Sequence, residues 1–260
     1  MGVYASGEKD DTPVCSSCIT GGMKRRPVVP GQNVHTQKGV KKGILKREQL
    51  SPGDRIFSDQ YVSSTLGKNF NGRGQQQSNL SYKGGTIFCD AASGYIYLQH
   101  QVSFTSTETV CSLLTFERES AQVGVTIKGY NTDNGVYTAK ELTTMLQNDA
   151  QSLRLSGVGA HHQNGPAENA IKNVSRKARI FMFHAALRWP SKFDKTLWPL
   201  AMNYAVYMHN HTPRRLDKYA PIELWTGSKS TYSELVNAHP WGCPTYVLDP
   251  RMQDGFKIPK

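Results

Sequence analysis

The chain has 260 residues, of which 38% are hydrophobic, and its 31 Lys and Arg outnumber its 20 Asp and Glu. This length and apolar content suffice for a buried core and indicate a globular protein of one domain or one domain with appendages. A formal net charge of +11 and a pI near 9.4 favour a polyanionic partner, although many basic proteins bind no nucleic acid.

Membrane and secretory signals are missing from the sequence. It contains no run of about 18 apolar residues, and its first residues lack the charged-then-apolar pattern of a secretory signal. We therefore expect a soluble, intracellular protein with no membrane partner. The five cysteines are an odd number spread over a long chain, which argues against a disulfide framework.

Three regions differ in composition. Residues 1–50 are poor in large apolar side chains and rich in Gly, Pro, Lys and Arg, which predicts a basic extended arm. Residues 51–228 carry the periodic apolar patterns of a folded domain. Residues 229–260 are interpreted as a C-terminal extension that we expect to be truncated.

The folded region begins with strands and continues with alternating helices and strands. Alternation of apolar and polar residues over 55–63 predicts a first strand, followed by a polar loop over 67–77. The β-prone runs 86–89 and 95–98 predict a hairpin beside it. Further predicted elements are a helix over 107–121 capped by Ser106 or Thr107, a strand over 125–131, a helix over 138–148, a weak strand over 153–155, and helices over 166–187 and 194–210. This order indicates an α/β domain around a mixed sheet.

Three carboxylates stand where a metal site can form. Transfer of a phosphodiester uses two divalent cations about 4 Å apart, which carboxylates hold. Asp59 lies in the first predicted strand among apolar neighbours, where a carboxylate needs a cation or a hydrogen-bond partner. Asp133 follows the fourth predicted strand, and Glu168 lies in the first turn of the long helix. Taken singly, Asp133 also fits an ordinary turn, and Glu168 fits a helix start.

The three acids lie in segments that resemble the acidic blocks of copia-type retrotransposon integrases, which are Asp-Asp-Glu recombinases of the retroviral integrase superfamily. These segments are Ser58-Asp59, Thr132-Asp133-Asn134-Gly135, and 163–169 with the sequence Gln-Asn-Gly-Pro-Ala-Glu-Asn. The resemblance continues through 193–210, 220–227 and 242–247, and upstream to the Cys15 and Cys18 pair, so it covers roughly residues 15–250.

The resemblance implies a fold, an activity and partners. The fold is RNase H-like, a five-stranded mixed sheet flanked by helices. Asp59, Asp133 and Glu168 are implied to bind two Mg²⁺ or Mn²⁺ ions and to catalyse DNA 3′-end processing and strand transfer. The partners are DNA, both element ends and target, and further copies of the chain in a homo-oligomer. The implied location is the nucleus and the cytoplasm, within virus-like particles, and we expect the chain to be a fragment of a larger polyprotein.

One face of the long predicted helix carries cations beside the third acid. Lys172, Ser175 and Arg179 follow Glu168 by four, seven and eleven residues, which places them on its face of the helix. We expect Lys172, Arg176 and Arg179 to contact DNA phosphates, and Asn134 and Asn164 to touch the DNA end. A solvated charged face is the alternative. A separate apolar stripe should pack on the sheet, formed by Ala167, Ala170, Ile171, Val174, Ala178 and Phe181.

The sequence departs from the integrase pattern at its beginning. Tetrahedral zinc needs four ligands, and no His precedes Cys15, so Cys15 and Cys18 supply half a site. His35 is a distant third candidate, and we expect no bound zinc. Asn169 replaces the basic residue that usually follows the third acid, and the 67–77 loop lengthens the interval between the first two acids. Neither change removes a metal ligand.

Two other functions fit parts of the sequence. A nuclease of the RNase H type shares the sheet but needs a fourth acid on the first long helix, for which Glu108 and Glu117 are candidates. An inactive nucleic-acid-binding remnant of a retrotransposon polyprotein would keep the same core and basic arm. A purely structural protein would leave the three spaced acids unexplained.

Overall fold

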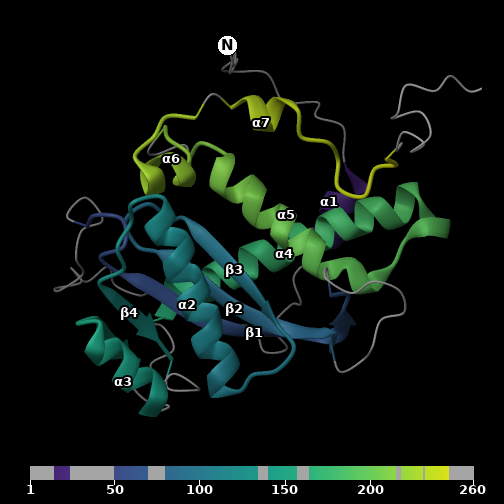
Figure 1. Cartoon of the computed structure of the whole chain (residues 1–260). Coiled ribbons are helices and arrows are strands. Elements are labelled where there is room, and N and C mark those ends of the chain that lie inside the picture. Colours follow the sequence, from purple (N-terminus) through teal and green to yellow (C-terminus); the bar gives the residue numbers. More distant parts are fainter. Residues whose placement is uncertain are drawn as a thin grey trace, which may run out of the picture.

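A computed structural model gives the fold, and it describes residues 15–23, 50–69, 80–133, 140–156, 164–214, 218–230 and 232–245. Figure 1 shows a central sheet with helices on both faces. None of the helices in these ranges has the length and apolar character needed to cross a membrane.

The sheet has five strands in the order β3-β2-β1-β4-β5. Neighbouring strands are antiparallel on the β3-β2-β1 side and parallel on the β1-β4-β5 side. The strands are β1 (Ile56–Gly67), β2 (Tyr82–Asp90), β3 (Ile96–Gln101), β4 (Gly129–Thr132) and β5 (Ser152–Leu155). This order with these directions defines the RNase H-like fold, which confirms the predicted mixed sheet.

Helices follow the strands in the predicted order. The α-helices are α1 (Ser16–Gly22), α2 (Ser106–Gln122), α3 (Lys140–Asn148), α4 (Gly165–Arg188), α5 (Trp198–His211), α6 (Pro221–Thr226) and α7 (Ser233–Val236). Two short 3-10 helices join α4 to α5, namely η5 (Pro190–Lys192) and η6 (Lys195–Leu197).

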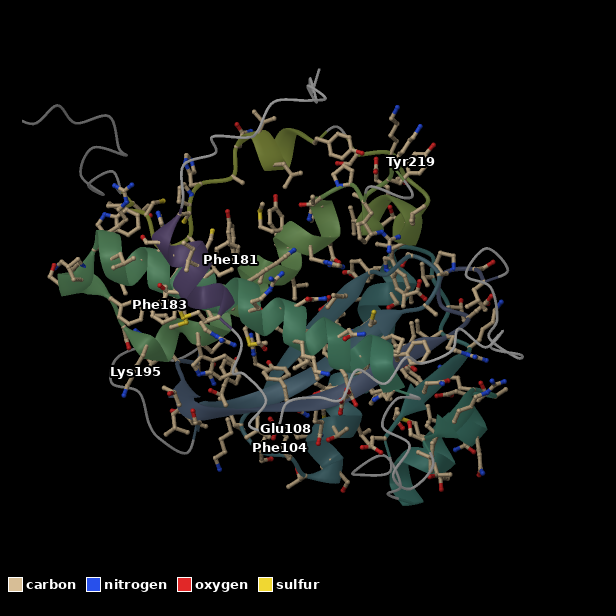
Figure 2. All side chains as sticks on the ribbon, turned by 180° about the vertical axis from the view of Figure 1, so that it is seen from behind. Phe104, Glu108, Phe181, Phe183, Lys195 and Tyr219 are labelled. Atoms are coloured by element: carbon tan, nitrogen blue, oxygen red, sulfur yellow. The ribbon has the colours of Figure 1, made fainter. Side chains whose placement is uncertain are left out.

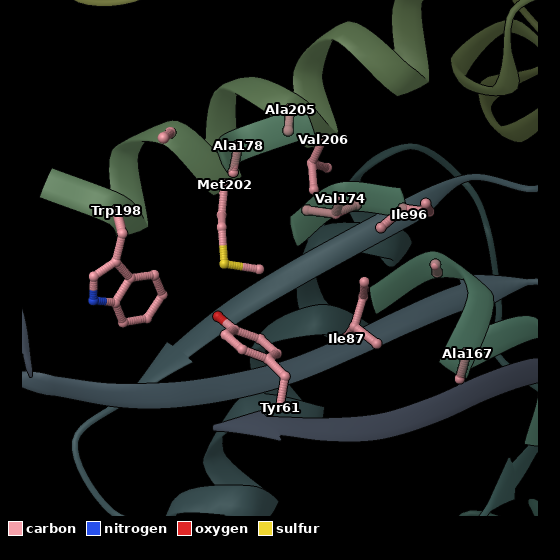
Figure 3. Close-up of a cluster of buried hydrophobic side chains, with 12 residues drawn as sticks. Tyr61, Ile87, Ile96, Ala167, Val174, Ala178, Trp198, Met202, Ala205 and Val206 are labelled. Atoms are coloured by element: carbon pink, nitrogen blue, oxygen red, sulfur yellow. The ribbon is translucent and has the colours of Figure 1, made fainter. Parts of the chain in front are cut away.

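Two hydrophobic clusters lie on opposite faces of the sheet, because successive strand residues point to opposite sides. On β2, Ile87 packs with α4 and α5, whereas Phe88 packs with Phe116 of α2. Figure 3 shows the first cluster, with Tyr61 and Ile87 of the sheet below Met202 of α5. The predicted apolar stripe of α4 belongs to this cluster, with Ala167, Ala170, Val174 and Ala178 buried and Ile171 and Phe181 partly buried.

The observed boundaries differ from the predicted ones where tertiary contacts decide them. Helix α2 is capped by Thr105, whose hydroxyl accepts the Glu108 N–H at 3.4 Å, so neither Ser106 nor Thr107 is the cap. Strand β4 begins at Gly129 rather than at residue 125, although Val125 and Ile127 are buried in the second cluster. Helix α5 begins at Trp198 rather than at residue 194, with Pro199 in its first turn.

Part of the predicted basic arm is helical. Helix α1 packs against α4, and Figure 2 shows it lying across that helix. The approach is close at Gly21, where a Cβ would come within 2.7 Å of Ile180 Cγ1. The sequence pattern predicts no helix here, because α1 has seven residues and little apolar periodicity. Residues 1–14 and 24–49 of the predicted arm lie outside the described residues.

Candidate active site

The register between β1 and β4 makes Asp59 and Asp133 neighbours. The two strands run parallel, and the last residues in register are Ser58 and Thr132. Asp59 and Asp133 are the next residues of their segments, and adjacent strands lie about 4.8 Å apart. Asp59 stands opposite Ile87 of β2, so its side chain shares the sheet face that α4 covers. Both aspartates are partly buried.

A hydrogen bond holds the start of α4 against β1 beside these aspartates. Asn164, which directly precedes α4, donates an Nδ2 hydrogen bond of 3.0 Å to the Ser58 carbonyl. Asn164 and Ser58 are both buried. Ala167, one turn into the helix, is fully buried and lies at the sheet in Figure 3. The first turn of α4, which carries Glu168, therefore begins beside Ser58, the residue that precedes Asp59 in β1.

Glu168 does not complete a metal cluster in this conformation. Its Oε2 accepts a hydrogen bond of 3.1 Å from Lys172 Nζ, and its side chain is 32% exposed. One Asp59 oxygen accepts the Gln60 N–H at 2.8 Å. Within the described residues, no three His, Cys, Asp or Glu side chains lie close enough to share one metal ion. The fold thus pairs the two aspartates and brings the helix start that bears the third acid to them.

A buried oxygen at the start of α4 lacks a protein partner. It is Asn164 Oδ1, which no hydrogen bond reaches from the described part of the chain. Thr132 Oγ1 also lacks a partner there, but Thr132 pairs with Ser58, so its side chain lies on the α2 face of the sheet, opposite to the aspartates. A buried polar atom without a partner is costly, so bound water or ligand is expected there. Mg²⁺ prefers carboxylate oxygens and keeps several of its own waters. The carboxylates of Asp59 and Asp133, with Asn164 Oδ1 held near them by the hydrogen bond to Ser58, fit a hydrated divalent cation.

A basic face on α4 runs away from the aspartates. Lys172, Arg176 and Arg179 are all exposed, as the helical spacing predicts, and the buried stripe with Val174 and Ala178 faces the sheet. Asn134, which we also expect to contact DNA, lies outside the described residues. So do Gly135 and residues 157–163 of the loop before α4.

The candidate fourth acids are committed to structural hydrogen bonds. Glu108 accepts the backbone N–H groups of Val102 and Ser103 at 2.8 and 2.7 Å. Glu117 accepts hydrogen bonds from Tyr130 Oη at 2.7 Å and Gln151 Nε2 at 2.8 Å. Both carboxylates therefore hold the segments around α2 through these hydrogen bonds.

The two cysteines of the amino-terminal segment form the start of α1. Cys15 is the N-cap, and its Sγ accepts the Cys18 N–H at 3.4 Å. This hydrogen bond lowers the pKa of Cys15, while the hydrogen bond to Cys15 raises the pKa of Cys18. Capping alone accounts for the three-residue spacing. The described residues offer no third zinc ligand beside the pair, and His35 lies outside them.

Comparison with known proteins gives similar structures but no similar sequence family. No protein-family model matches the chain, and no curated protein matches it either. Among solved structures, the simian T-cell lymphotropic virus intasome, in complex with PP2A regulatory subunit B56 gamma, has a chain that is 18% identical. The match covers 77% of the present chain and 60% of that chain, with a TM-score of 0.49.

The HTLV-2 integrase catalytic core domain in complex with magnesium is also similar, in a trimeric and a dimeric form. Each is 16% identical with a TM-score of 0.45, and the matches cover 67% and 68% of the present chain and 97% and 98% of those chains. Identities this low carry neither a residue role nor an activity from those proteins to this chain.

Proposed function

We propose that this chain is the catalytic core of an integrase of the copia type, which cuts and joins DNA with divalent metal ions. The observation that carries the proposal is the β1–β4 register, which makes Asp59 and Asp133 neighbours on the sheet face under α4. The order of acids along the chain, with Glu168 as the third, supports it. DNA 3′-end processing and strand transfer are the proposed reactions.

In this proposal the sheet supplies two acids and the helix supplies the third. Asp59 and Asp133 would hold the ions between them, and Glu168 would complete the site from the helix. Bound Mg²⁺ or Mn²⁺ would supply positive charge for the attacking and the leaving oxygen of the phosphodiester. Asn164 holds the first turn of α4 at Ser58, so it positions Glu168 relative to the strands.

Glu168 can leave Lys172 at little cost. Their ion pair lies on the helix surface, with the Lys172 side chain 69% exposed, and exposed pairs four residues apart contribute roughly 0.3–0.5 kcal/mol. A DNA phosphate that takes over the Lys172 ammonium therefore frees the Glu168 carboxylate. Substrate binding and completion of the metal site would be coupled through this one lysine.

The proposed partners are DNA, both as element ends and as target, and further copies of this chain in a homo-oligomer. The net charge of +11 and the exposed cations of α4 support the DNA partner. We also propose that the chain acts on DNA in the nucleus, after a stage in cytoplasmic virus-like particles.

A joining assay tests the proposal. Purified protein is incubated with labelled linear DNA in Mg²⁺, in Mn²⁺ or in EDTA, and the products are separated by length. We expect trimmed and joined products with metal and none with EDTA. Cleavage of RNA in an RNA–DNA hybrid would instead identify an RNase H-type nuclease, which the engaged Glu108 and Glu117 disfavour. Salt-sensitive binding without any product would identify a non-catalytic DNA-binding protein.

Lys172 should contribute to DNA affinity through one phosphate contact. We expect Lys172→Gln to weaken binding about equally for all sequences and to reduce the slope of log affinity against log salt by about one. Fluorescence anisotropy with duplex DNA at several salt concentrations measures both. Lys229→Gln, which removes an exposed lysine next to α6, is the matched control for lost charge and should leave the slope unchanged. Equal slopes for the two variants would show that Lys172 does not contact a DNA phosphate.

A further inference from the structure

Strand β1 has a free backbone edge beyond the end of β4. The Arg55 carbonyl accepts the Ala91 N–H, and the register with β2 is regular up to Val62. Over this stretch odd-numbered residues of β1 direct their backbone groups to β2 and even-numbered residues direct theirs to the β4 side. Pairing with β4 stops at Ser58, and within the described residues no strand continues it. Among the described residues, the backbone groups of Gln60 and Val62 on that side have no partner, except that the Gln60 N–H donates to Asp59 Oδ1.

This free edge is bounded at both ends. The Ser58 carbonyl accepts from Asn164 at one end. Past Val62 the pairing with β2 shifts register before Gly67, and there the Thr65 carbonyl accepts the Trp198 Nε1–H at 2.8 Å. The window from Gln60 to Ser64 spans about 17 Å at 3.3 Å per residue, which is the length of a short strand. Unprotected edges of this kind attract another strand, so natural proteins usually cover them.

An apolar groove runs along the same window. It has a volume of about 540 Å³ and lies between β1, α4 and the start of α5. Four consecutive β1 residues, Tyr61 to Ser64, line it, as expected where the strand edge and the register shift after Val62 together form one wall. Tyr61, Trp198 and Met202 lie together in Figure 3, and the exposed Phe183 of α4 also lines the groove and is labelled in Figure 2.

The charge of the groove selects its occupant. Arg179 is the one charged residue among those that line it, and Arg176 and Lys172 continue the basic face of α4. The Val62 N–H and the carbonyls of Gln60 and Val62, which have no partner among the described residues, match another extended peptide backbone, whereas a nucleic acid offers no such alternation of donor and acceptor. We infer that the β1 edge binds an extended peptide of alternating apolar and acidic residues, which adds a strand at Gln60–Ser64 and places apolar side chains in the groove.

Amide NMR with a defined probe tests this inference on the full chain, independently of any DNA-joining activity. The probe is a synthetic peptide of about six residues in which valine and glutamate alternate. We expect shifts confined to the amides of Gln60–Ser64 and to the groove side of α4. The same peptide with methylated backbone nitrogens on its β1-facing residues should bind at least about fivefold more weakly, because it cannot donate to the edge.

Variants at Val62 separate the edge from the side chain. Val62→Pro removes a donor on the free side, where proline is tolerated in edge strands, and should weaken the peptide about fivefold. Val62→Ala keeps the donor and should bind as the unaltered chain does, since the Val62 side chain is 74% exposed. Three results overturn the inference: no shifts at millimolar peptide, equal binding of the methylated peptide, or edge shifts produced only by oligo-dT or by raising the protein concentration.

Discussion

An Asp133→Asn variant is expected to join DNA ends about a thousandfold more slowly than the unaltered chain. The substitution keeps the shape of the side chain but removes the negative charge that stands next to Asp59. Loss of a carboxylate from a divalent-metal site removes several kcal/mol of transition-state stabilisation, and each 1.36 kcal/mol is a factor of ten in rate. Single-turnover joining of labelled DNA in Mg²⁺ measures the effect.

Asp149→Asn is the matched control, because Asp149 is an exposed aspartate that follows α3. It should join DNA at the unaltered rate. Thermal unfolding of both variants checks that the fold is kept, and titration calorimetry with Mn²⁺ should show weaker metal binding for Asp133→Asn alone. Joining by Asp133→Asn within a factor of ten of the unaltered rate, with the fold intact, would remove Asp133 from the site.

Acidification should destabilise the fold through one buried histidine. His100 is 8% exposed, and burial lowers its pKa from 6.5 to about 4, against the raising effect of hydrogen bonds to Asn203 and Pro199. Its Nδ1 lies 2.7 Å from Tyr61 Oη, and its Nε2 lies 2.9 Å from Asn203 Oδ1 and 3.1 Å from the Pro199 carbonyl. Two acceptors at Nε2 mean that this nitrogen carries the proton and that Nδ1 accepts from Tyr61.

The direction of the pH effect follows from the pKa values of His100 in the unfolded and the folded chain. Between pH 6.5 and 4 the unfolded chain binds a proton at His100 and the folded chain does not, so stability is lost as the pH falls through this window. The difference corresponds to roughly 3 kcal/mol when complete. Urea unfolding of the unaltered chain and of His100→Gln at pH 7 and pH 4.5 measures it. The variant should be less stable at pH 7 but lose less on acidification, and equal losses would contradict the assignment.

Local patterns in the sequence predicted most of the architecture. The buried stripe of α4 and the placing of Glu168 and Lys172 on one face both follow from helical periodicity. Two-residue alternation located β1, and two β-prone runs located the β2–β3 hairpin. Helix α1 is not predictable in this way, because Gly21 depends on contact with Ile180 far along the chain. The Thr105 cap was missed by one position, since Thr105, Ser106 and Thr107 can all cap and the preceding loop decides between them.

The candidate site was predictable in its acids but not in its surroundings. Asp59 was predicted from its place in a strand and Asp133 from its place directly after one, and the β1–β4 register makes the two neighbours. The role of Asn164 in tying α4 to Ser58 joins residues 106 positions apart, and no local signal carries it.

The two faces of the sheet impose different limits on sequence change. Small side chains fill the contact between α4, α5 and the sheet, namely Ala167, Ala170, Ala178, Ala201 and Ala205. On the opposite face aromatic rings pack together, as in Phe88 and Phe116, whose ring centroids lie 4.6 Å apart. Added volume between close helices forces backbone shifts, while a ring can be exchanged for another of similar size. Molecular volume, more than polarity, therefore restricts which substitutions α4 accepts, and α4 is the helix that sets the distance between Glu168 and the aspartates.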